Sequence, residues 1–355
     1  MRVTGQAQRA AWLGRVLPPV EAVRAGVWSL PVPIPDSPLR YTLCYVLDLP
    51  GGLVVVDPGW DTDLGWGTLV DGLALAGAGI GDVSGVVLTH VHPDHHGLTA
   101  RLRDASDAWV AMHPAERDSL PSRARVSARG VAADETWLRR CGVPADVAAE
   151  LVLRRELLAR FAAMARPDRL LHDGDSIPGD KGRFRAVWTP GHTPGHLCFH
   201  DTVEDLLLTG DHVLPRISPN IGLQPHAEDL PLAAYLESLA RVTAYDSAEV
   251  LPAHEYRFVG LAQRVHALHR HHEERCAEVI AVLSEAGTGT VWDVTQHLSW
   301  SRGWGSVTGF MRRAAVAETA AHLHYLAERS EVVLASGEPV WLWSLPSDVN
   351  EGQSV

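Results

Sequence analysis

The chain has 355 residues, of which 46% are hydrophobic and 21% are charged, so it is long enough for a buried core and unlike a collagen, a coiled coil or a wholly disordered chain. The sequence has 31 lysine and arginine residues and 43 aspartate and glutamate residues, so the net charge is −12. A negative charge of this size is unfavourable for binding nucleic acid, which is itself negatively charged.

Residues 1–26 form an N-terminal extension that lacks the apolar run and cleavage site of a signal peptide. No stretch reaches the roughly 18 apolar residues that a membrane span requires. The four cysteines show no CxxC spacing, so the sequence predicts neither a disulfide framework nor a zinc ribbon. We therefore expect a cytoplasmic protein without a membrane partner.

The segment from residue 27 to residue 100 carries alternating strand and helix signals. The predicted elements are strands at 27–32, 41–47 and 53–56, a helix around 64–76 and a buried strand at 85–88. The third strand ends at Asp57, and the last one leads into a loop crowded with histidines. This order predicts an α/β layered domain.

A mostly helical insertion is expected over residues 100–165. Its last part, 147–165, has apolar positions at helical spacing, which indicates either an amphipathic surface helix or a lid over a substrate. Strand signals return at 184–188 and 205–209, and each of these strands ends in a polar cluster. Polar clusters at successive strand ends are typical of a site at the edge of a layered sheet.

The pattern changes near residue 260, where we place a domain boundary. Helices are predicted at 265–285, 290–298 and 309–329, followed by strand-like segments at 331–334 and 340–343. This order resembles a winged-helix module, so we expect a small, mostly helical winged-helix-like domain over 261–346 and a C-terminal tail over 347–355.

The strongest functional signal is the segment His90-x-His92-x-Asp94-His95, which directly follows a predicted buried strand. Such a density of imidazole and carboxylate groups has no ordinary packing explanation. Alternate residues of an extended turn point the same way, so His90 and His92 can share one ion. Asp94 and His95 can then face a second ion about 3.5–4 Å away, as in two-metal hydrolytic sites.

Further fragments carry His192 and His196, Asp211 and His212, and His254. Together with the Asp57-Pro58-Gly59 turn and the histidine motif, in this order, they resemble the metallo-β-lactamase-fold hydrolases over about residues 27–260. The resemblance implies an αββα sandwich. The ligand set and the C-terminal module are similar to the glyoxalase II and LACTB2-like branches of that superfamily.

The resemblance implies two divalent metal ions. Zinc is the default for an imidazole-rich site, and iron or manganese are the alternatives. His90, His92 and His192 would hold the first ion, Asp94, His95 and His254 the second, and Asp211 would bridge them. None of the cysteines stands at a ligand position, which disfavours the antibiotic-hydrolysing members that use a thiolate.

Other residues near these motifs have expected supporting roles. Asp57 resembles the family acid that orients a ligand histidine, with strand capping as the alternative. His96 and His196 are expected to donate hydrogen bonds to the ligand set. The expected substrate-pocket residues are His212, Arg216 and Asn220. The histidines at 266, 269, 271 and 272 are expected to lie on a solvated or interfacial helix face.

We therefore expect a dinuclear metal-dependent hydrolase in which a hydroxide bridging the ions attacks the carbonyl of a small thioester, ester or lactone. Asp94 is the expected proton shuttle and the catalytic residue of the chain. The serine hydrolase motif G-x-S-x-G is absent, which fits direct attack by water.

Two other functions are consistent with the motifs. The first is a metal-dependent endoribonuclease or phosphodiesterase of the LACTB2-like type. The second is a redox or binding protein, which the absence of a flavodoxin-like half disfavours. Residues 261–355 contain seven arginines and no lysine against eleven acidic residues, so we expect this domain to pack on the core or form a homodimer contact rather than bind nucleic acid.

Overall fold

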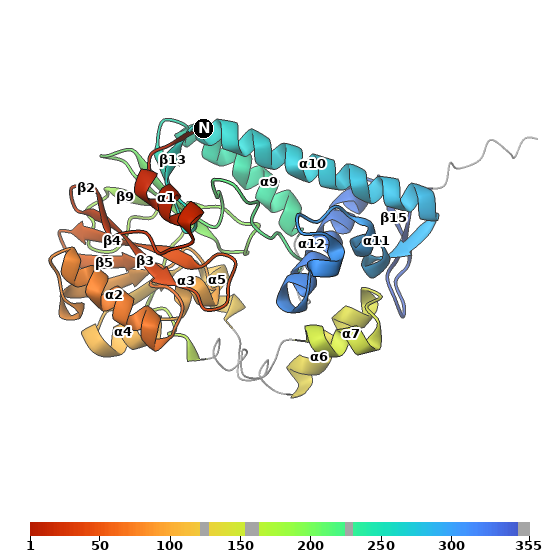
Figure 1. The fold of residues 1–355 in the computed structure, drawn as a ribbon, viewed down its shortest axis with the longest axis horizontal. Coiled ribbons are helices and arrows are strands. Elements are labelled where there is room, and N and C mark those ends of the chain that lie inside the picture. Colours follow the sequence, from red (N-terminus) through yellow and green to blue (C-terminus); the bar gives the residue numbers. More distant parts are fainter. Residues whose placement is uncertain (121–127, 153–162, 224–229, 347–355) are drawn as a thin grey trace, which may run out of the picture. The chain divides into compact units, whose positions relative to one another are not determined.

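The strands of the N-terminal two thirds assemble into two β-sheets in the computed structural model, which describes residues 1–120, 128–152, 163–223 and 230–346. Contacts between Cα atoms divide the chain into two units. The first consists of Met1–Arg123, Glu156–Pro219 and Tyr235–Ala267, and the second of Ala124–Arg155, Asn220–Ala234 and Leu268–Val355. All strands of the two large sheets belong to the first unit (Figure 1).

The first sheet has seven strands in the order β2-β3-β4-β5-β6-β7-β8. Their bounds are β2 Glu21–Arg24, β3 Val27–Pro33, β4 Tyr41–Leu49, β5 Gly52–Val56, β6 Val83–Val87, β7 Trp109–Met112 and β8 Arg169–Leu170. The strands from β2 to β5 pair antiparallel, whereas β5, β6, β7 and β8 pair parallel. The predicted strands at 27–32, 41–47, 53–56 and 85–88 are confirmed as β3 to β6.

The second sheet has six strands in the order β1-β13-β12-β11-β10-β9. Their bounds are β1 Arg2–Val3, β9 Phe184–Trp188, β10 Leu197–Asp201, β11 Leu206–Gly210, β12 Glu249–Pro252 and β13 Phe258–Val259. β10 pairs antiparallel with both β9 and β11, and β11 pairs parallel with β12. β9, β11 and β12 therefore run in the same direction and end at the same edge.

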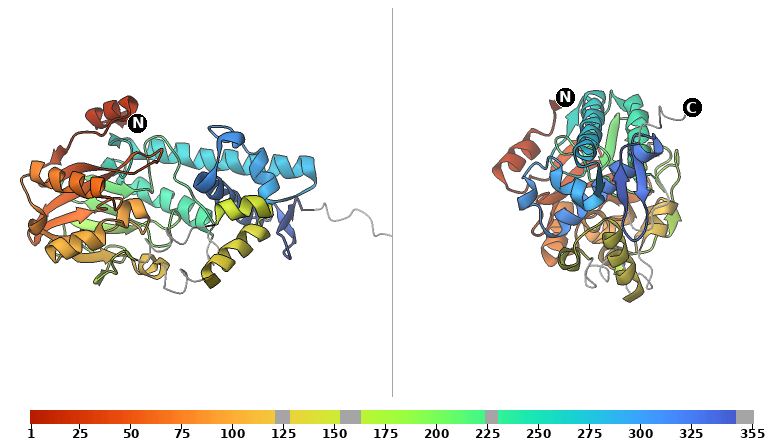
Figure 2. Two further views of the ribbon diagram at one scale, coloured as in Figure 1. Left: turned by 60° about the horizontal axis from the view of Figure 1, so that its bottom comes forward. Right: turned by 90° about the vertical axis from the view of Figure 1, so that its right-hand side faces the viewer.

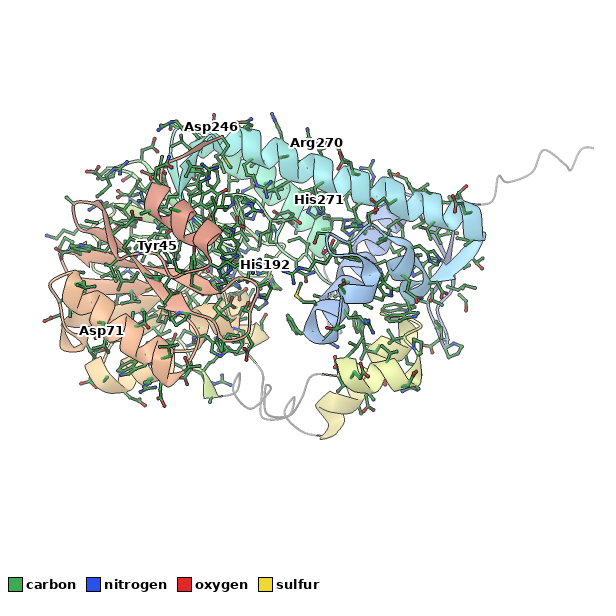
Figure 3. All side chains as sticks on the ribbon, viewed as in Figure 1. Tyr45, Asp71, His192, Asp246, Arg270 and His271 are labelled. Atoms are coloured by element: carbon green, nitrogen blue, oxygen red, sulfur yellow. The ribbon has the colours of Figure 1, made fainter. Side chains whose placement is uncertain are left out.

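The two sheets enclose one apolar core because alternate residues of each strand face the other sheet. Tyr41, Leu43, Tyr45 and Leu47 of β4 belong to the same buried cluster as Phe184, Phe199 and Leu208 of the second sheet. A second cluster joins the outer face of the first sheet to α2 (Asp63–Leu75) and α4 (Thr99–Ser106). Tyr45 points between the sheets, and Asp71 of α2 points to solvent (Figure 3).

Five segments with predicted site residues follow strands that end at one edge of each sheet. Asp57 follows β5, the histidine motif follows β6, His192 follows β9, Asp211 follows β11 and His254 follows β12. In the first sheet β5 and β6 are parallel neighbours, and in the second β11 and β12 are parallel neighbours. The topology thus places the chemically active loops at the carboxyl ends of these strands.

The segment expected to be mainly helical between 100 and 165 also contains the strand β7. Its residues Val110 and Met112 are buried in the outer cluster while Ala111 is buried between the sheets. A strand buried on both faces lacks the alternation of polar and apolar residues, so periodicity does not reveal it. The helices described after β7 in this segment are α5 Pro114–Ser119, α6 Ala128–Arg140 and α7 Ala145–Leu151. Much of the predicted helix at 147–165 lies outside the described residues.

The C-terminal part contains the predicted helices and strands together with one short strand, β14, that was not predicted. Its elements are α10 Leu261–Ala286, β14 Thr288–Thr290, α11 Val291–His297, α12 Gly309–Glu328, β15 Val333–Ser336 and β16 Leu342–Ser344. The three strands form an antiparallel sheet in the order β14-β16-β15. Thr290 and Asp293 form a capping box that begins α11. α10 continues without a break through the boundary between the units (Figure 2).

No helix in the described part of the chain combines the length and apolar character needed to cross a membrane.

Candidate metal centre

The histidine motif occupies the turn between β6 and α4. Pro93 begins the short helix α3, Pro93–His96, because its fixed φ suits the first helical position. The backbone N–H groups of His95 and His96 both donate to the carbonyl of His92, at 3.0 and 2.9 Å. His92 therefore points from an extended residue, while Asp94 and His95 point from the helical turn. This change of backbone conformation separates the motif into two groups of ligands.

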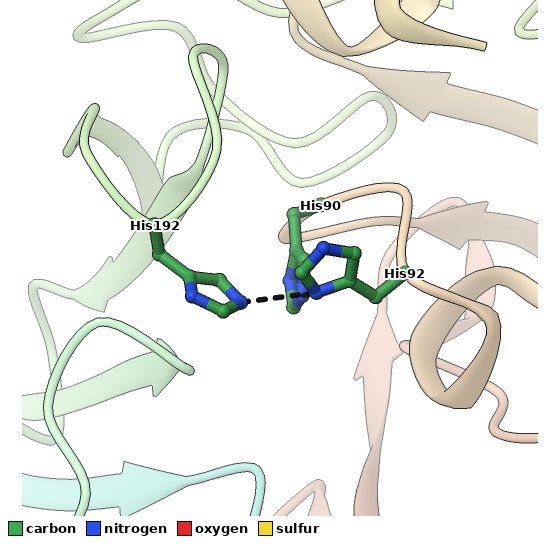
Figure 4. A group of neighbouring side chains, drawn as sticks. All are labelled: His90, His92 and His192. Atoms are coloured by element: carbon green, nitrogen blue, oxygen red, sulfur yellow. Dashed lines mark hydrogen bonds between the residues drawn. The ribbon is translucent and has the colours of Figure 1, made fainter. Parts of the chain in front are cut away.

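The first group consists of His90, His92 and His192, whose ligand atoms lie within 4.8 Å of one another (Figure 4). His92 Nδ1 lies 2.9 Å from His90 Nε2 and 3.0 Å from His192 Nε2. His90 is fully buried, whereas His92 and His192 are half-buried. Three imidazole nitrogens thus converge from the loops after β6 and β9.

The second group consists of Asp94, His95 and His254. Asp94 Oδ2 lies 3.8 Å from His95 Nε2 and 3.5 Å from His254 Nε2. Both histidines are fully buried, while the carboxylate of Asp94 retains partial exposure. This group joins the loop after β6 to the loop after β12.

Asp211 lies between the two groups. Its Oδ1 is 3.6 Å from His95 Nε2 and 3.2 Å from His254 Nε2, and its Oδ2 is 3.7 Å from His192 Nε2. His90, His95 and Asp211 form a third set of converging ligand atoms. One carboxylate therefore faces both groups with different oxygens.

The electrostatics of the centre follow from burial and from Asp211. Burial, reinforced by neighbouring imidazoles, lowers the pKa of His90 and His92 well below the usual value, so both rings are neutral and can offer a lone pair. Burial is the largest single effect on His95 and His254 and acts to lower their pKa, but the nearby carboxylates, Asp211 foremost and Asp94 after it, together outweigh burial and raise the pKa of both. Burial would raise the pKa of Asp211, but His254 and His95 hold it well below its usual range.

The donor atoms fit a pair of divalent cations. His95 Nε2, His254 Nε2 and Asp211 Oδ1 are buried, and none has a hydrogen-bond partner of acceptable geometry among the described residues. Leaving a buried polar atom unsatisfied costs about 1–3 kcal/mol. Imidazole nitrogens and carboxylate oxygens are ligands of zinc and other divalent ions. A cation would therefore satisfy buried atoms that the described residues leave without well-oriented partners.

Asp57 contacts the centre through His95. Its Oδ2 accepts hydrogen bonds from His95 Nδ1 at 2.8 Å and from the hydroxyl of Thr89 at 2.6 Å. Its Oδ1 accepts from the backbone N–H of Thr89 at 2.8 Å. Because Nδ1 of His95 donates to the carboxylate, Nε2 is the ring nitrogen that faces Asp94 and Asp211 and would bind a cation.

We expect Asp57→Asn to weaken metal binding about 10- to 100-fold, the usual effect of losing a hydrogen-bond partner of a ligand histidine. The NH₂ group of the amide would face a hydrogen-bond donor in place of one of the carboxylate oxygens that now accept hydrogen bonds. Metal affinity measured by competition with a chromophoric chelator checks this expectation, and an unchanged affinity would contradict the orienting role.

His254 is oriented by a residue that the sequence did not indicate. Its Nδ1 lies 2.9 Å from the backbone carbonyl of Tyr41 in β4. Any residue type carries this carbonyl, so no sequence signal identifies it. The same applies to Gly191, where an added β-carbon would lie 2.4 Å from Cα of Tyr235 in α9, Pro231–Val242. This close approach fixes the loop that presents His192.

The two supporting histidines have different contacts. His196 accepts the backbone N–H of Asp211 at Nε2, 3.3 Å away, and its Nδ1 lies 2.8 Å from the hydroxyl of Thr189. His96 is buried beside α4, with Nδ1 2.9 Å from the hydroxyl of Thr99. His196 thus forms a hydrogen bond with the backbone of Asp211, while His96 forms one with Thr99 of α4.

The three expected pocket residues differ in environment. His212 is fully buried and packs edge-on against Tyr235, with ring centroids 5.2 Å apart. Arg216 is exposed, and its backbone N–H donates to Glu255 at 3.0 Å. Asn220 belongs to the second unit, where its amide donates to Glu318 and to the carbonyl of Ala314, both at 3.2 Å.

Comparison with known proteins places the same residues in a family context. A sequence profile described as the metallo-beta-lactamase superfamily matches residues 37–254. The crystal structure of a metallo-beta-lactamase family protein from Thermus thermophilus is similar with a TM-score of 0.75 and 30% identity, over 92% of this chain and 100% of that one.

Other relatives match over smaller parts of the chain. The lactamase-like protein adaB of Aspergillus niger is 34% identical over 116 residues, which are 33% of this chain and 34% of that protein. The alignment thus spans about a third of this fungal relative. The acyl-coenzyme A thioesterase MBLAC2 of Gallus gallus is 28% identical over 223 residues, which are 62% of this chain and 73% of that protein.

Proposed function

The chain belongs to the metallo-β-lactamase superfamily of hydrolases, and from this premise we propose that it is a dinuclear metal-dependent hydrolase of a thioester, ester or lactone. The observation that carries the proposal is the position of Asp211. Its two oxygens face two separate groups of ligand side chains, as a carboxylate shared by two cations must.

In this proposal His90, His92 and His192 hold the first cation, and Asp94, His95 and His254 hold the second. Asp211 contributes to both. The imidazole-rich donor set favours zinc, with iron or manganese as alternatives. When bound, such a pair of ions lowers the pKa of a water molecule toward neutrality and polarises a substrate carbonyl.

The chain supplies a proton acceptor next to this position. Asp94 is held by its place in α3, where its backbone carbonyl accepts the hydroxyl of Thr42 at 2.7 Å. Its carboxylate is 13% exposed, whereas His95 and His254 beside it are fully buried. Asp94 Oδ2 can therefore take a proton from an incoming water and pass it to solvent or to a leaving group.

The cysteines offer no competing nucleophile. Three of the four are buried, and Cys276 is partly buried. Burial raises the pKa of Cys198 and Cys276 to about 12, and it also raises the pKa of Cys44 and Cys141. A thiol with such a pKa is protonated at neutral pH. This supports direct attack by water rather than a covalent thioester intermediate.

A carbonyl substrate is favoured over a nucleic acid by charge. The segment 261–355, which we interpret as a winged-helix-like module, carries seven arginines against eleven acidic residues. Two of these arginines are buried in ion pairs, Arg275 with Glu278 at 2.7 Å and Arg313 with Asp134 at 2.5 Å. The guanidinium groups of these two arginines are therefore paired with carboxylates of the protein rather than exposed to bind phosphates. The relative named an acyl-coenzyme A thioesterase further supports an acyl substrate.

The experiment that tests the proposal combines metal analysis of the purified protein with a panel of acyl-coenzyme A thioesters, lactones, β-lactams and short RNAs. We expect two divalent ions per chain and thioester hydrolysis that a chelator removes and added metal restores. Full activity of metal-free protein would contradict the mechanism. Cleavage of RNA without carbonyl hydrolysis would show that the protein is a phosphodiesterase instead.

A further inference from the structure

A buried carboxylate that is not itself a candidate ligand forms hydrogen bonds to two of the loops that carry the ligands. Glu116 lies in α5 and has an exposed fraction of 0%. Its Oε2 accepts the backbone N–H of Val91 at 2.8 Å, and its Oε1 accepts the backbone N–H of Gly195 at 2.7 Å. The two oxygens of one side chain thus bind two segments that are far apart in the sequence.

Both N–H groups lie close in sequence to candidate metal ligands. Val91 stands between His90 and His92, and Gly195 stands three residues after His192. The three imidazoles of the first group come from these two loops alone. Ring nitrogens from the two loops approach to 3.0 Å, between His92 and His192. Glu116 therefore spans the gap across which the first group is assembled.

We propose that Glu116 is a positioning residue that sets the metal affinity of the His90, His92 and His192 group by holding their two loops in register. The inference rests on the proposed function, since it assigns a role within the same centre. The two hydrogen bonds are short, at 2.8 and 2.7 Å, and both are shielded from water, which suits this role.

The surroundings of Glu116 keep it in place. His113 caps the N-terminus of α5 by accepting the N–H of Ala115 at 3.2 Å, and its ring stacks on Trp188 at 5.2 Å between centroids. Trp188 ends β9, which leads into the loop of His192. A β-carbon at Gly195 would lie 2.7 Å from the backbone N of Glu116, so the loop reaches α5 this closely only without a side chain there.

The second group is oriented by other residues. His95 donates to Asp57, and His254 lies against the carbonyl of Tyr41. The hydrogen bonds of the Glu116 side chain reach neither of these ligands. Loss of the Glu116 carboxylate should therefore weaken one metal position and spare the other, which a general loss of stability would not do.

The test uses Glu116→Gln in two backgrounds, each of which retains one metal position. His254→Ala removes a ligand of the second position, and His92→Ala removes a ligand of the first. Glutamine keeps the volume of glutamate but has a single acceptor oxygen for two N–H groups. Zinc or cobalt affinity, measured by chelator competition, should fall about 10- to 100-fold in the His254→Ala background and stay unchanged in the His92→Ala background.

Asp201→Asn is the matched control, and Glu116→Ala is the more severe variant. Asp201 is also a buried carboxylate that accepts backbone N–H groups, those of Val203 and Glu204, and it binds Arg183. Its substitution should lower the melting temperature without changing metal affinity in either background.

Equal affinity losses in both backgrounds, or wild-type affinity for Glu116→Gln, would overturn the positioning role while leaving the hydrolase proposal intact. A wild-type protein that binds no metal would overturn both.

Discussion

Asp211→Asn is expected to lower kcat/KM for a thioester substrate by roughly 10³-fold, which corresponds to about 4 kcal/mol of lost transition-state stabilisation. The reason is that Asp211 faces both ligand groups, with Oδ1 near His95 and His254 and Oδ2 near His192. An amide has one acceptor oxygen and no charge, so it cannot serve two cations. Steady-state kinetics with metal analysis of the same preparation measure the effect.

Two controls separate this loss from damage to the fold. Asp201→Asn removes a buried carboxylate that ends β10 and binds Arg183. His271→Ala removes a histidine of α10 that is outside the ligand groups found among the described residues. Both variants should retain substantial activity. If Asp211→Asn were as active as either control, the shared carboxylate would not be part of the catalyst.

The ligand groups could be predicted because their information is local in the sequence. The motif from His90 to His95 carries four side chains on one turn, and the other ligands each follow a strand. Strand direction then brings them together, because the strands that precede them end at the same sheet edges. The resemblance of these motifs to the metallo-β-lactamase-fold hydrolases named the seven candidate ligands, and strand order explains why their side chains lie close together.

The supporting contacts could not be predicted in the same way. The carbonyl of Tyr41 and the N–H groups of Val91 and Gly195 are backbone atoms, so residue type does not reveal their partners. Glu116 lies in a segment expected to be a helical insertion and resembles an ordinary helix acid in the sequence. The position of Glu116 is set by β7, the strand that directly precedes α5. This strand is buried on both faces and lacks the alternation of polar and apolar residues that would identify it in the sequence.

Metal loading is expected to raise the stability of the protein by about 4 kcal/mol when the free metal concentration is a thousand times Kd. Three buried atoms, His95 Nε2, His254 Nε2 and Asp211 Oδ1, lack well-oriented hydrogen-bond partners among the described residues, and the ions would satisfy all three. At about 2–4 °C per kcal/mol for a unit of this size, the melting temperature should rise by roughly 10 °C. Differential scanning calorimetry of chelator-treated and zinc-loaded protein measures this rise.

Variants of the metal ligands should reduce the zinc-induced rise in melting temperature by different amounts. His254→Ala removes a ligand of one position and leaves the other, so zinc should still raise its melting temperature, by less than in the wild type. Asp211→Asn affects both positions and should lose more of the rise than His254→Ala does. Because binding energy at a site that exists only in the folded chain is folding energy, equal rises in all three proteins would place the zinc elsewhere in the molecule.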